Sequence, residues 1–309
     1  MRVIFMGTPD FSVPILESIA AAGHEVVLTV TQPDRHKGRH GHTVPSPVKE
    51  CALKLDIPVY TPEKVSTPEG VEYLKGFDPD IMVVAAYGQI LSKEILDLPR
   101  TCCVNVHASL LPAYRGASPI QWAVINGEEY SGVTTMRMEE GLDTGDIIEV
   151  SKIKLADNET AGSLFDRLSG AGAQLIVSTL EKIGDGTATF TPQGDDGVTY
   201  TRQIKKSLGD LDFSKSAVEL SRLVRGLDPW PGAFTRLNGK NFKILKVSVA
   251  EGQTDSAPGT IVSAGRDGFL VATGDGLLAL EEVQLEGKKR MSAEDFLRGV
   301  HPEEGTLLG

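Results

Sequence analysis

The N-terminal half of the chain alternates short apolar runs with stretches of helical periodicity. Residues 2–6 and 26–30 have the mainly apolar composition of strands that are buried on both faces. Residues 10–22 lie between them with the spacing of a helix, and Gly23 follows as a helix-terminating residue. A strand, a helix and a second strand in this order form a right-handed crossover. The pattern therefore predicts a parallel sheet with helices on its faces.

The same alternation continues to about residue 183. Further helices are expected at residues 47–54, 68–75 and 160–183, and further strands at residues 59–60, 80–86, 131–138 and 146–154. The last helix has an apolar stripe, which we interpret as core: Leu164, Leu168, Leu175, Ile176 and Leu180. We therefore expect an α/β domain with a Rossmann-like, doubly wound and mostly parallel sheet.

A change in composition after residue 183 indicates a second domain. Residues 184–200 are rich in Gly, Thr, Asp and Pro, which is typical of an interdomain linker. A helix is expected at residues 217–226, and short alternating segments follow at residues 242–249, 259–262, 268–272 and 276–283. Such segments, separated by Gly and Asp turns, predict a small β-barrel. The expected division is residues 1–189, a linker at 190–206, and residues 207–309.

The first predicted turn lacks two common nucleotide-binding motifs. Gly7-Thr8-Pro9-Asp10 does not match G-x-G-x-x-G, and Pro9 has no backbone N–H to offer a pyrophosphate. A G-x-x-x-x-G-K-S/T phosphate loop is also missing from the sequence. These observations argue against a nicotinamide-dependent oxidoreductase and against a P-loop nucleotidase.

Candidate chemistry is concentrated around residue 105. Asn105 and His107 are one residue apart at the end of an expected strand, so their side chains should share one face. The following segment is interrupted by Pro and Gly, as in loops that form binding sites. Asp143 lies further along the chain between Gly141 and Gly145. An amide, an imidazole and a carboxylate together can form a proton-transfer and oxyanion-binding site.

Each of these three residues also has a purely structural interpretation. A single histidine at a strand end is more often a hydrogen-bonded structural residue than a catalytic one. Asn105 could be a turn residue, and Asp143 could bond only to its own loop. The combination favours a shared site, because three separate polar groups in such positions cost stability unless they serve a function.

The motifs around these residues resemble the signature of the folate-dependent formyltransferases. The resemblance rests on residues 105–116, with the pattern N-x-H-x-S-L-L-P-x-Y-R-G, on the G-x-D-x-G pattern at 141–145, and on residues 3–11 and 225–234. It implies a catalytic trio of Asn105, His107 and Asp143, and 10-formyltetrahydrofolate as co-substrate. It further implies that the acceptor is the methionine amine of charged initiator tRNA, and that an OB-like C-terminal barrel binds this tRNA. By the same resemblance, the folate pocket involves Tyr87, Gly88, Gln89, Ser109, Leu110, Leu111 and Pro112.

The distribution of charge is consistent with a polyanionic partner. The net charge is −11, yet residues 202–246 contain 10 basic and 4 acidic residues. Residues 32–45 form a long polar segment that we expect to lack regular structure, and its cations favour contact with phosphates. Without the family context, a solvated basic face is an equally good interpretation. The resemblance implies tRNA contacts by Arg39, and we extend the assignment to the neighbouring or basic positions Arg35, Lys37, Lys205 and Lys206.

Cysteine usage and hydropathy suggest the cellular setting. Cys51, Cys102 and Cys103 are odd in number and two are adjacent, which favours a reduced, cytoplasmic chain. No Cys-x-x-Cys spacing is present, so no metal is expected. The first apolar run is too short for a signal peptide or a membrane span. We expect a monomer with no membrane association.

Three alternatives remain open at this stage. A related 10-formyltetrahydrofolate hydrolase or dehydrogenase domain, or a formyltransferase acting on the amine of a sugar nucleotide, would share the same catalytic trio. The basic segments favour tRNA over a sugar nucleotide, which needs only a few cations. A non-catalytic RNA-binding module is disfavoured because all three residues of the trio are present.

Overall fold

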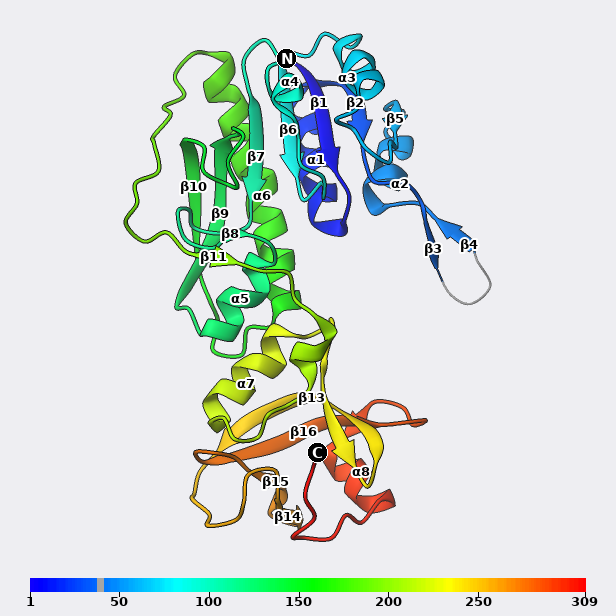
Figure 1. Cartoon of the computed structure of the whole chain (residues 1–309), viewed down its shortest axis with the longest axis vertical. Helices are drawn as coiled ribbons and strands as arrows, with labels where there is room; N and C mark the ends of the chain where they lie inside the picture. The colour runs from blue at the N-terminus through cyan, green and yellow to red at the C-terminus, as the bar shows by residue number, and fades with distance from the viewer. Residues whose placement is uncertain (38–41) are drawn as a thin grey trace. The chain divides into compact units, whose positions relative to one another are not determined.

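A computed structural model describes residues 1–37 and 42–309 of the chain, which divide into two compact units (Figure 1). Unit 1 contains Met1–Pro119, Tyr130–Lys154 and Phe165–Thr201. Unit 2 contains Ile120–Glu129, Leu155–Leu164 and Arg202–Gly309. Each unit has its own sheet and its own apolar core.

Unit 1 is built on a seven-stranded sheet in the order β10-β9-β7-β6-β1-β2-β5. The five strands from β7 to β5 are parallel to one another, whereas β9 pairs antiparallel with both β7 and β10. The predicted α/β architecture is therefore confirmed, with a mixed sheet that is mostly parallel. The strands are β1 (Arg2–Gly7), β2 (Glu25–Val30), β5 (Val59–Tyr60), β6 (Ile81–Ala85), β7 (Cys103–His107), β9 (Tyr130–Arg137) and β10 (Ile147–Lys154).

Helices cover both faces of this sheet. The helices of unit 1 are α1 (Val13–Ala21), preceded by the 3-10 turn η1 (Asp10–Ser12), α2 (Pro47–Lys54), α3 (Pro68–Lys75), α4 (Lys93–Leu96) and the part of α6 (Ala161–Gly184) from residue 165 on. On one face, Leu74 of α3 and Ile95 of α4 belong to the same buried cluster as Cys103 of β7. On the other face, the backbone of Gly172 in α6 lies against Val106 and against Ile15 of α1.

The helix boundaries agree with the expected capping chemistry. Ser46 and Thr67 precede α2 and α3, and each is followed by a proline at the first helical position. The Ser46 hydroxyl accepts a hydrogen bond from the backbone N–H of Lys49 at 3.0 Å. The Thr67 hydroxyl accepts one from the N–H of Gly70 at 3.1 Å. These bonds satisfy N–H groups that have no partner inside the helix.

Two short pairs of strands lie outside the main sheet. β3 (Arg35–Lys37) pairs antiparallel with β4 (His42–Val44), within the segment that the sequence predicted to be irregular. The prediction of irregular structure was wrong at residues 35–37 and 42–44. Strand pairing depends on backbone hydrogen bonds, which a polar composition does not prevent. The second pair joins β8 (Arg115–Gly116) to β11 (Tyr200–Thr201) in parallel.

Unit 2 is organised around a separate antiparallel sheet. Its strands lie in the order β12-β13-β16-β15-β14, and β17 pairs with β16. Sequence periodicity predicted β13 to β16 and α7, but missed the first strand of the sheet and the last helix. The elements are α5 (Pro119–Asn126, its first residue in unit 1), the 3-10 turn η2 (Lys206–Gly209), α7 (Ala217–Gly226), β12 (Ala233–Leu237), β13 (Lys240–Ala250), β14 (Ile261–Gly265), β15 (Gly268–Ala272), β16 (Leu277–Leu285), β17 (Met291–Ser292) and α8 (Ala293–Gly299).

Three phenylalanine rings form the centre of the unit 2 core. Phe242 of β13, Phe269 of β15 and Phe296 of α8 are almost fully buried. Their ring centroids lie 5.2 to 6.1 Å apart. Aromatic pairs at such distances stabilise a core beyond the area they bury. The last helix is therefore attached to the sheet through its one large aromatic side chain.

Ser216, the residue immediately before α7, offers a test of the local stability of this helix. The Ser216 hydroxyl accepts a hydrogen bond from Glu219 N–H at 3.2 Å, and the Glu219 carboxylate accepts one from Ser216 N–H at 3.0 Å. Ser216→Ala removes half of this capping box and should cost about 1 kcal/mol. We expect amides of α7 to exchange with deuterium about fivefold faster. Ser207→Ala, at an exposed serine of η2, is the control, and equal exchange in both variants would contradict the assignment.

Candidate active site

Strand β7 places Asn105 and His107 on the same face of the central sheet. Alternate residues of a strand point to opposite sides, and Val104 and Val106 are 0% and 2% exposed on the other side. Both polar residues lie towards the carboxyl end of the strand, and His107 is its last residue. In open α/β sheets this edge is where ligands bind.

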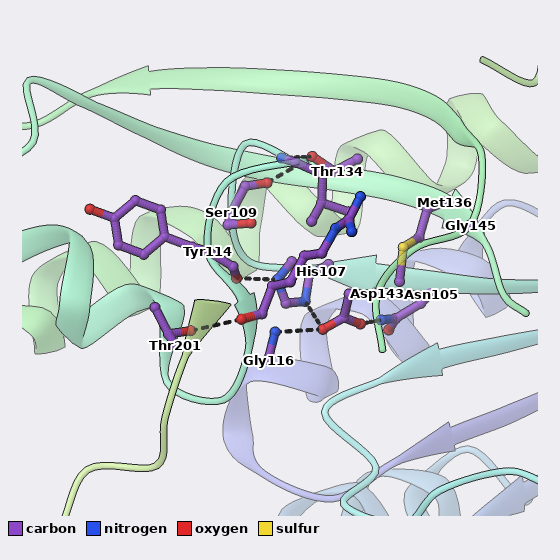
Figure 2. Close-up of polar contacts among 12 residues, drawn as sticks. Asn105, His107, Ser109, Tyr114, Gly116, Thr134, Met136, Asp143, Gly145 and Thr201 are labelled. Atoms are coloured by element: carbon purple, nitrogen blue, oxygen red, sulfur yellow. Dashed lines mark hydrogen bonds and ion pairs between the residues drawn. The ribbon is translucent and has the colours of Figure 1, made fainter. Parts of the chain in front are cut away.

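Asp143 completes a cluster with these two residues (Figure 2). Its Oδ1 accepts a long hydrogen bond from Asn105 Nδ2 at 3.4 Å, and its Oδ2 lies 3.8 Å from His107 Nδ1. The backbone N–H of Gly116 donates to Oδ2 at 2.8 Å. The side chains of His107 and Asp143 are 8% and 13% exposed. The structure thus brings together the three residues that the sequence singled out, in a largely desolvated position.

The loop that carries Asp143 has a tightly specified backbone. Asp143 has a φ of +53°, in the left-handed region that side chains other than those of Gly, Asn and Asp rarely adopt. At Gly145, an added Cβ would lie 1.7 Å from the carbonyl oxygen of Arg137. Arg137 also forms an ion pair with Asp146 on the far side of this glycine. The glycine is therefore required by the close approach of two backbone segments.

The hydrogen bonds of His107 identify which nitrogen can exchange a proton. Nε2 lies 3.0 Å from the carbonyl oxygen of Tyr114, which can only accept a hydrogen bond. Nε2 therefore carries a hydrogen, and Nδ1 is the nitrogen that changes protonation state. Nδ1 faces Asp143, at a distance that suits an ion pair when the imidazole is charged but exceeds a hydrogen bond. Nδ1 of His107 is therefore turned towards the Asp143 carboxylate without being hydrogen-bonded to it.

The 109–112 segment lies directly after β7 and is held in place by hydrogen bonds to neighbouring residues. The Ser109 hydroxyl donates to the carbonyl of Ala113 at 2.7 Å. The hydroxyl of Thr134 in β9 donates to the carbonyl of Ser109 at 2.7 Å and accepts from Leu111 N–H at 3.2 Å. Ser109 and Leu111 are buried, whereas Leu110 and Pro112 are partly exposed. Within this predicted folate-binding segment, only the two partly exposed side chains are open to a ligand.

The other predicted folate residues lie at the turn after β6. Tyr87 is 2% exposed within the apolar core, and its burial raises the pKa of the phenol. The Gln89 side chain is engaged with the backbone of residues 62–65, accepting from Val65 N–H at 2.9 Å. Gly88 has a φ of +91°, and its missing side chain leaves its backbone open. The side chain of Tyr87 is therefore used in core packing, and that of Gln89 in hydrogen bonds to the backbone. A ligand at this turn would contact backbone atoms.

Several groups of this site were missed by sequence reasoning. The carbonyl of Tyr114 and the N–H of Gly116 contact the catalytic candidates directly. Gln193, in the segment interpreted as a linker, donates to the backbone carbonyls of Asp143 and Gly145 at 2.9 and 2.7 Å. Backbone groups carry no sequence signal, and a single Gln in a polar segment has no distinctive spacing. The sequence signal that could have identified some of these groups is the Tyr114-Arg115-Gly116 tripeptide, which follows shortly after Pro112.

The predicted tRNA-binding residues fall into three categories. Arg35 and Lys37 belong to strand β3, and Arg39 lies outside the described residues. Lys205 and Lys206 are exposed at the start of η2 in unit 2. Within residues 1–37 and 42–309, no helix is both long and apolar enough to cross a membrane, and no group of three or more His, Cys, Asp or Glu could hold a metal.

Two family models match the chain. The formyl transferase model covers residues 1–180, and the model of the formyl transferase C-terminal domain covers residues 203–301. The methionyl-tRNA formyltransferase of Agathobacter rectalis is 58% identical over 308 residues, which span 100% of this chain and 99% of the relative. The methionyl-tRNA formyltransferase of Clostridioides difficile is 46% identical over 309 residues, spanning 100% of both chains.

Solved structures with lower identity share the fold. An N-formyltransferase from Helicobacter canadensis, in complex with folinic acid and dTDP-3-aminofucose, has a TM-score of 0.66 and 19% identity over 91% of this chain and 99% of its own. HypX from Aquifex aeolicus, in complex with tetrahydrofolic acid, has a TM-score of 0.65 and 17% identity over 96% of this chain and 47% of its own. The chain therefore belongs to the formyl transferase family, and within this family it groups with the methionyl-tRNA formyltransferases.

Proposed function

We propose that this protein transfers the formyl group of 10-formyltetrahydrofolate to the amino group of methionine on charged initiator tRNA. The observation that carries the proposal is the convergence of Asn105, His107 and Asp143 in a chain that is similar over its whole length to methionyl-tRNA formyltransferases. The reaction needs a polarised formyl carbonyl, an amine that loses a proton, and a leaving nitrogen that gains one. The three side chains provide these functions.

Asn105 stabilises negative charge on the formyl oxygen. Its amide nitrogen has two hydrogens, and Asp143 accepts one of them in the structure. The second hydrogen is available to the formyl oxygen as the amine adds to the formyl carbon. Hydrogen bonds of this kind contribute about 3 to 4 kcal/mol to transition-state stabilisation.

His107 and Asp143 move the proton. The Asp143 carboxylate has acceptor capacity beyond its bonds to Asn105 and Gly116, and accepts a proton from the incoming ammonium group directly or through a water. Nδ1 of His107, whose other nitrogen is occupied by the Tyr114 carbonyl, takes part in delivering a proton to the leaving nitrogen of tetrahydrofolate. The ammonium group loses two protons in becoming the formamide nitrogen. One of them is delivered to the leaving nitrogen and the other is released to solvent, so the reaction from the ammonium form releases one proton. Ser109, with its hydroxyl bonded to Ala113, is not the nucleophile.

The residues around the candidate site fit a folate. Leu110 and Pro112 present partly exposed apolar groups that suit the faces of a pterin ring, and the open backbone at Gly88 can approach its polar edge. We assign Tyr87, Gln89, Ser109 and Leu111 a part in forming the pocket through their backbone and packing. The family and the tetrahydrofolate complex of a structurally similar protein support the class of co-substrate. The chemistry proposed here uses no metal.

The second unit is proposed to bind the tRNA. The domain division proposed is a catalytic part at residues 1–189, a connection at 190–206, and an OB-like barrel at 207–309, supported by the antiparallel sheet and by the C-terminal domain match. Arg35, Lys37, Arg39, Lys205 and Lys206 are the proposed phosphate contacts. The catalytic trio lies within one unit of one chain, which supports a monomeric enzyme. Translation uses the product, so we place the protein in the cytoplasm.

A formyl-transfer assay with different acceptors tests this proposal. The protein is incubated with 10-formyltetrahydrofolate and either methionine-charged initiator tRNA, methionine-charged elongator tRNA, a sugar-nucleotide amine or no acceptor. We expect formylmethionine on initiator tRNA and release of tetrahydrofolate in equal amounts. Release without an acceptor would instead indicate a hydrolase, and formylation of the sugar amine alone would indicate a sugar-nucleotide enzyme.

Lys205 and Lys206 provide a test of the tRNA assignment. The double variant Lys205→Ala/Lys206→Ala should weaken use of charged tRNA and leave the KM for folate unchanged. If both lysines contact phosphates, the dependence of log KM for tRNA on log salt should become shallower by about two. Lys288→Ala/Lys289→Ala removes the same charge from exposed positions of unit 2 and is the control. An unchanged salt dependence in the first variant would refute the assignment.

A further inference from the structure

Gln193 contacts both the loop of the catalytic carboxylate and a buried arginine. Its Nε2 donates to the carbonyls of Asp143 and Gly145 at 2.9 and 2.7 Å. Its Oε1 accepts two hydrogen bonds from the Arg115 guanidinium, from Nε at 3.1 Å and from Nη2 at 2.7 Å. One side-chain amide therefore makes these four hydrogen bonds, and its Nε2 also lies 3.9 Å from Sδ of Met136.

Arg115 is fixed as firmly as the amide it binds. It is only 7% exposed, and its Nη1 donates to the hydroxyl of Tyr200 at 3.3 Å. Its backbone N–H donates to the carbonyl of Thr199 at 2.9 Å, and its carbonyl accepts from the Thr201 hydroxyl at 3.2 Å, as Figure 2 shows for the threonine. A fork-shaped guanidinium that binds one oxygen with two N–H groups holds that oxygen in a defined place.

The segment that carries Gln193 is anchored on both sides of it. Thr191 exchanges two backbone hydrogen bonds of 2.8 Å with Ile147 of β10. Eight residues after Thr191, the Thr199 hydroxyl accepts from Tyr114 N–H at 2.8 Å. The 191–201 segment is therefore tied to β10 at one end and to the 114–116 tripeptide at the other. The chain on either side of Gln193 is therefore held in place by hydrogen bonds that do not involve the Gln193 side chain.

Only glutamine satisfies all of these contacts. The two carbonyls require a donor with two hydrogens, and the guanidinium requires an acceptor on the same side chain. A carboxylate would accept from Arg115 but would face two carbonyl oxygens without a hydrogen to donate. An aliphatic residue would leave a buried guanidinium and two carbonyls without these partners, which is costly.

The Arg115-Gly116 dipeptide reaches Asp143 by two routes. The N–H of Gly116 binds the carboxylate directly at 2.8 Å. The Arg115 side chain acts through Gln193 on the backbone of the same aspartate. Asp143 is thereby held both at its side-chain carboxylate and at its backbone carbonyl. Because the φ of Asp143 lies in the left-handed region, the loop needs such external contacts to keep this conformation.

The geometry points to Gln193 and Arg115 as positioning residues of formyl transfer, a role that rests on the function proposed above. They act through Asp143, by holding its loop where the carboxylate meets Asn105 and His107. They touch neither substrate in this account. Their removal should therefore affect the chemical step rather than the binding of folate or tRNA, because a displacement of about 1 Å at a catalytic group can cost about 100-fold in rate.

The first test compares kinetic constants of variants. Gln193→Ala and Gln193→Glu should lower kcat about 100-fold, and Arg115→Lys, which loses the fork, about tenfold. The KM for 10-formyltetrahydrofolate and for charged tRNA should each stay within about threefold of wild type. Gln174→Glu makes the same change at an exposed position of α6 and should leave kcat unchanged. Wild-type kcat in folded Gln193→Glu protein would overturn the inference.

A double-mutant cycle separates positioning from a general structural role. Gln193→Ala is combined with Asp143→Ala, and transfer is measured in single turnovers with enzyme in excess. If Gln193 acts through the carboxylate, its replacement should cost less than about twofold once the carboxylate is gone. A full 100-fold additional loss would show an independent role and contradict the inference. If wild-type protein transfers no formyl group, the proposed function fails instead, so the two outcomes are distinguishable.

Discussion

Replacement of any one of Asn105, His107 and Asp143 by alanine is expected to lower kcat for formyl transfer by orders of magnitude. Loss of the Asn105 amide removes one donor to the formyl oxygen, for which a loss of about 10²- to 10³-fold is typical. Loss of His107 or Asp143 removes a proton-transfer group, for which about 10²- to 10⁴-fold is typical. Turnover is measured with labelled 10-formyltetrahydrofolate and charged initiator tRNA at saturating concentrations.

The contacts within the cluster determine what the combined variants should show. The three side chains contact one another through Asp143, so they act as a unit. Residues that act as a unit lose activity non-additively, and the triple variant should be little worse than the worst single variant. Asp166→Ala, at an exposed aspartate of α6, is the control and should have wild-type turnover. Near-normal turnover in any folded single variant would refute its assigned role.

The second large effect is expected from Gly145→Ala. The new Cβ would lie 1.7 Å from the carbonyl oxygen of Arg137, a backbone atom that cannot move away without shifting β9. The loop must shift instead, and it carries the Asp143 carboxylate two residues earlier. We expect kcat to fall about 100-fold, the cost of a displacement of about 1 Å at a catalytic group. The measurement is kcat per folded enzyme, with folding checked by circular dichroism.

Gly170→Ala is the matched control for this glycine. No atom other than its own helix backbone and chain neighbours lies within 4 Å of the position of an added Cβ, and the residue is inside α6. Alanine in a helix interior should raise the free energy of unfolding by about 0.5 to 1 kcal/mol. Activity should remain at the wild-type level. Equal activity of the Gly145→Ala and Gly170→Ala proteins would show that the loop does not need its present backbone.

The parts of the fold that could be predicted from sequence are those with local signals. Helix α2 begins at the proline of a Ser-Pro pair, and α7 begins after a serine with a glutamate three residues on, so both were predicted with little error. The buried strands β1 and β6 are continuous apolar runs. The strand pair β3 and β4 and the helix α8 were missed, because the first is polar and the second has few apolar residues.

The candidate site was predictable to the extent that side chains carry it. Asn105 and His107 share one face of a strand because side-chain direction repeats every two residues along a strand, and this spacing can be read directly from the sequence. The role of residues 191–201 was not visible, because it depends on pairing with segments that are about 45 and 85 residues away in the chain. A Gly- and Thr-rich composition is shared by linkers and by segments anchored through their backbone. Only the three-dimensional structure separates these two cases.

The most direct test of the proposed catalytic cluster is a crystal structure of the protein with a stable 10-formyltetrahydrofolate analogue bound. We expect the formyl oxygen of the analogue within hydrogen-bond reach of the Asn105 amide, about 2.6–3.2 Å or one bridging water, with His107 and Asp143 on the side from which an amine would approach. We also expect the pterin ring against Leu110 and Pro112. A folate bound with its formyl group away from all three catalytic candidates would contradict the account.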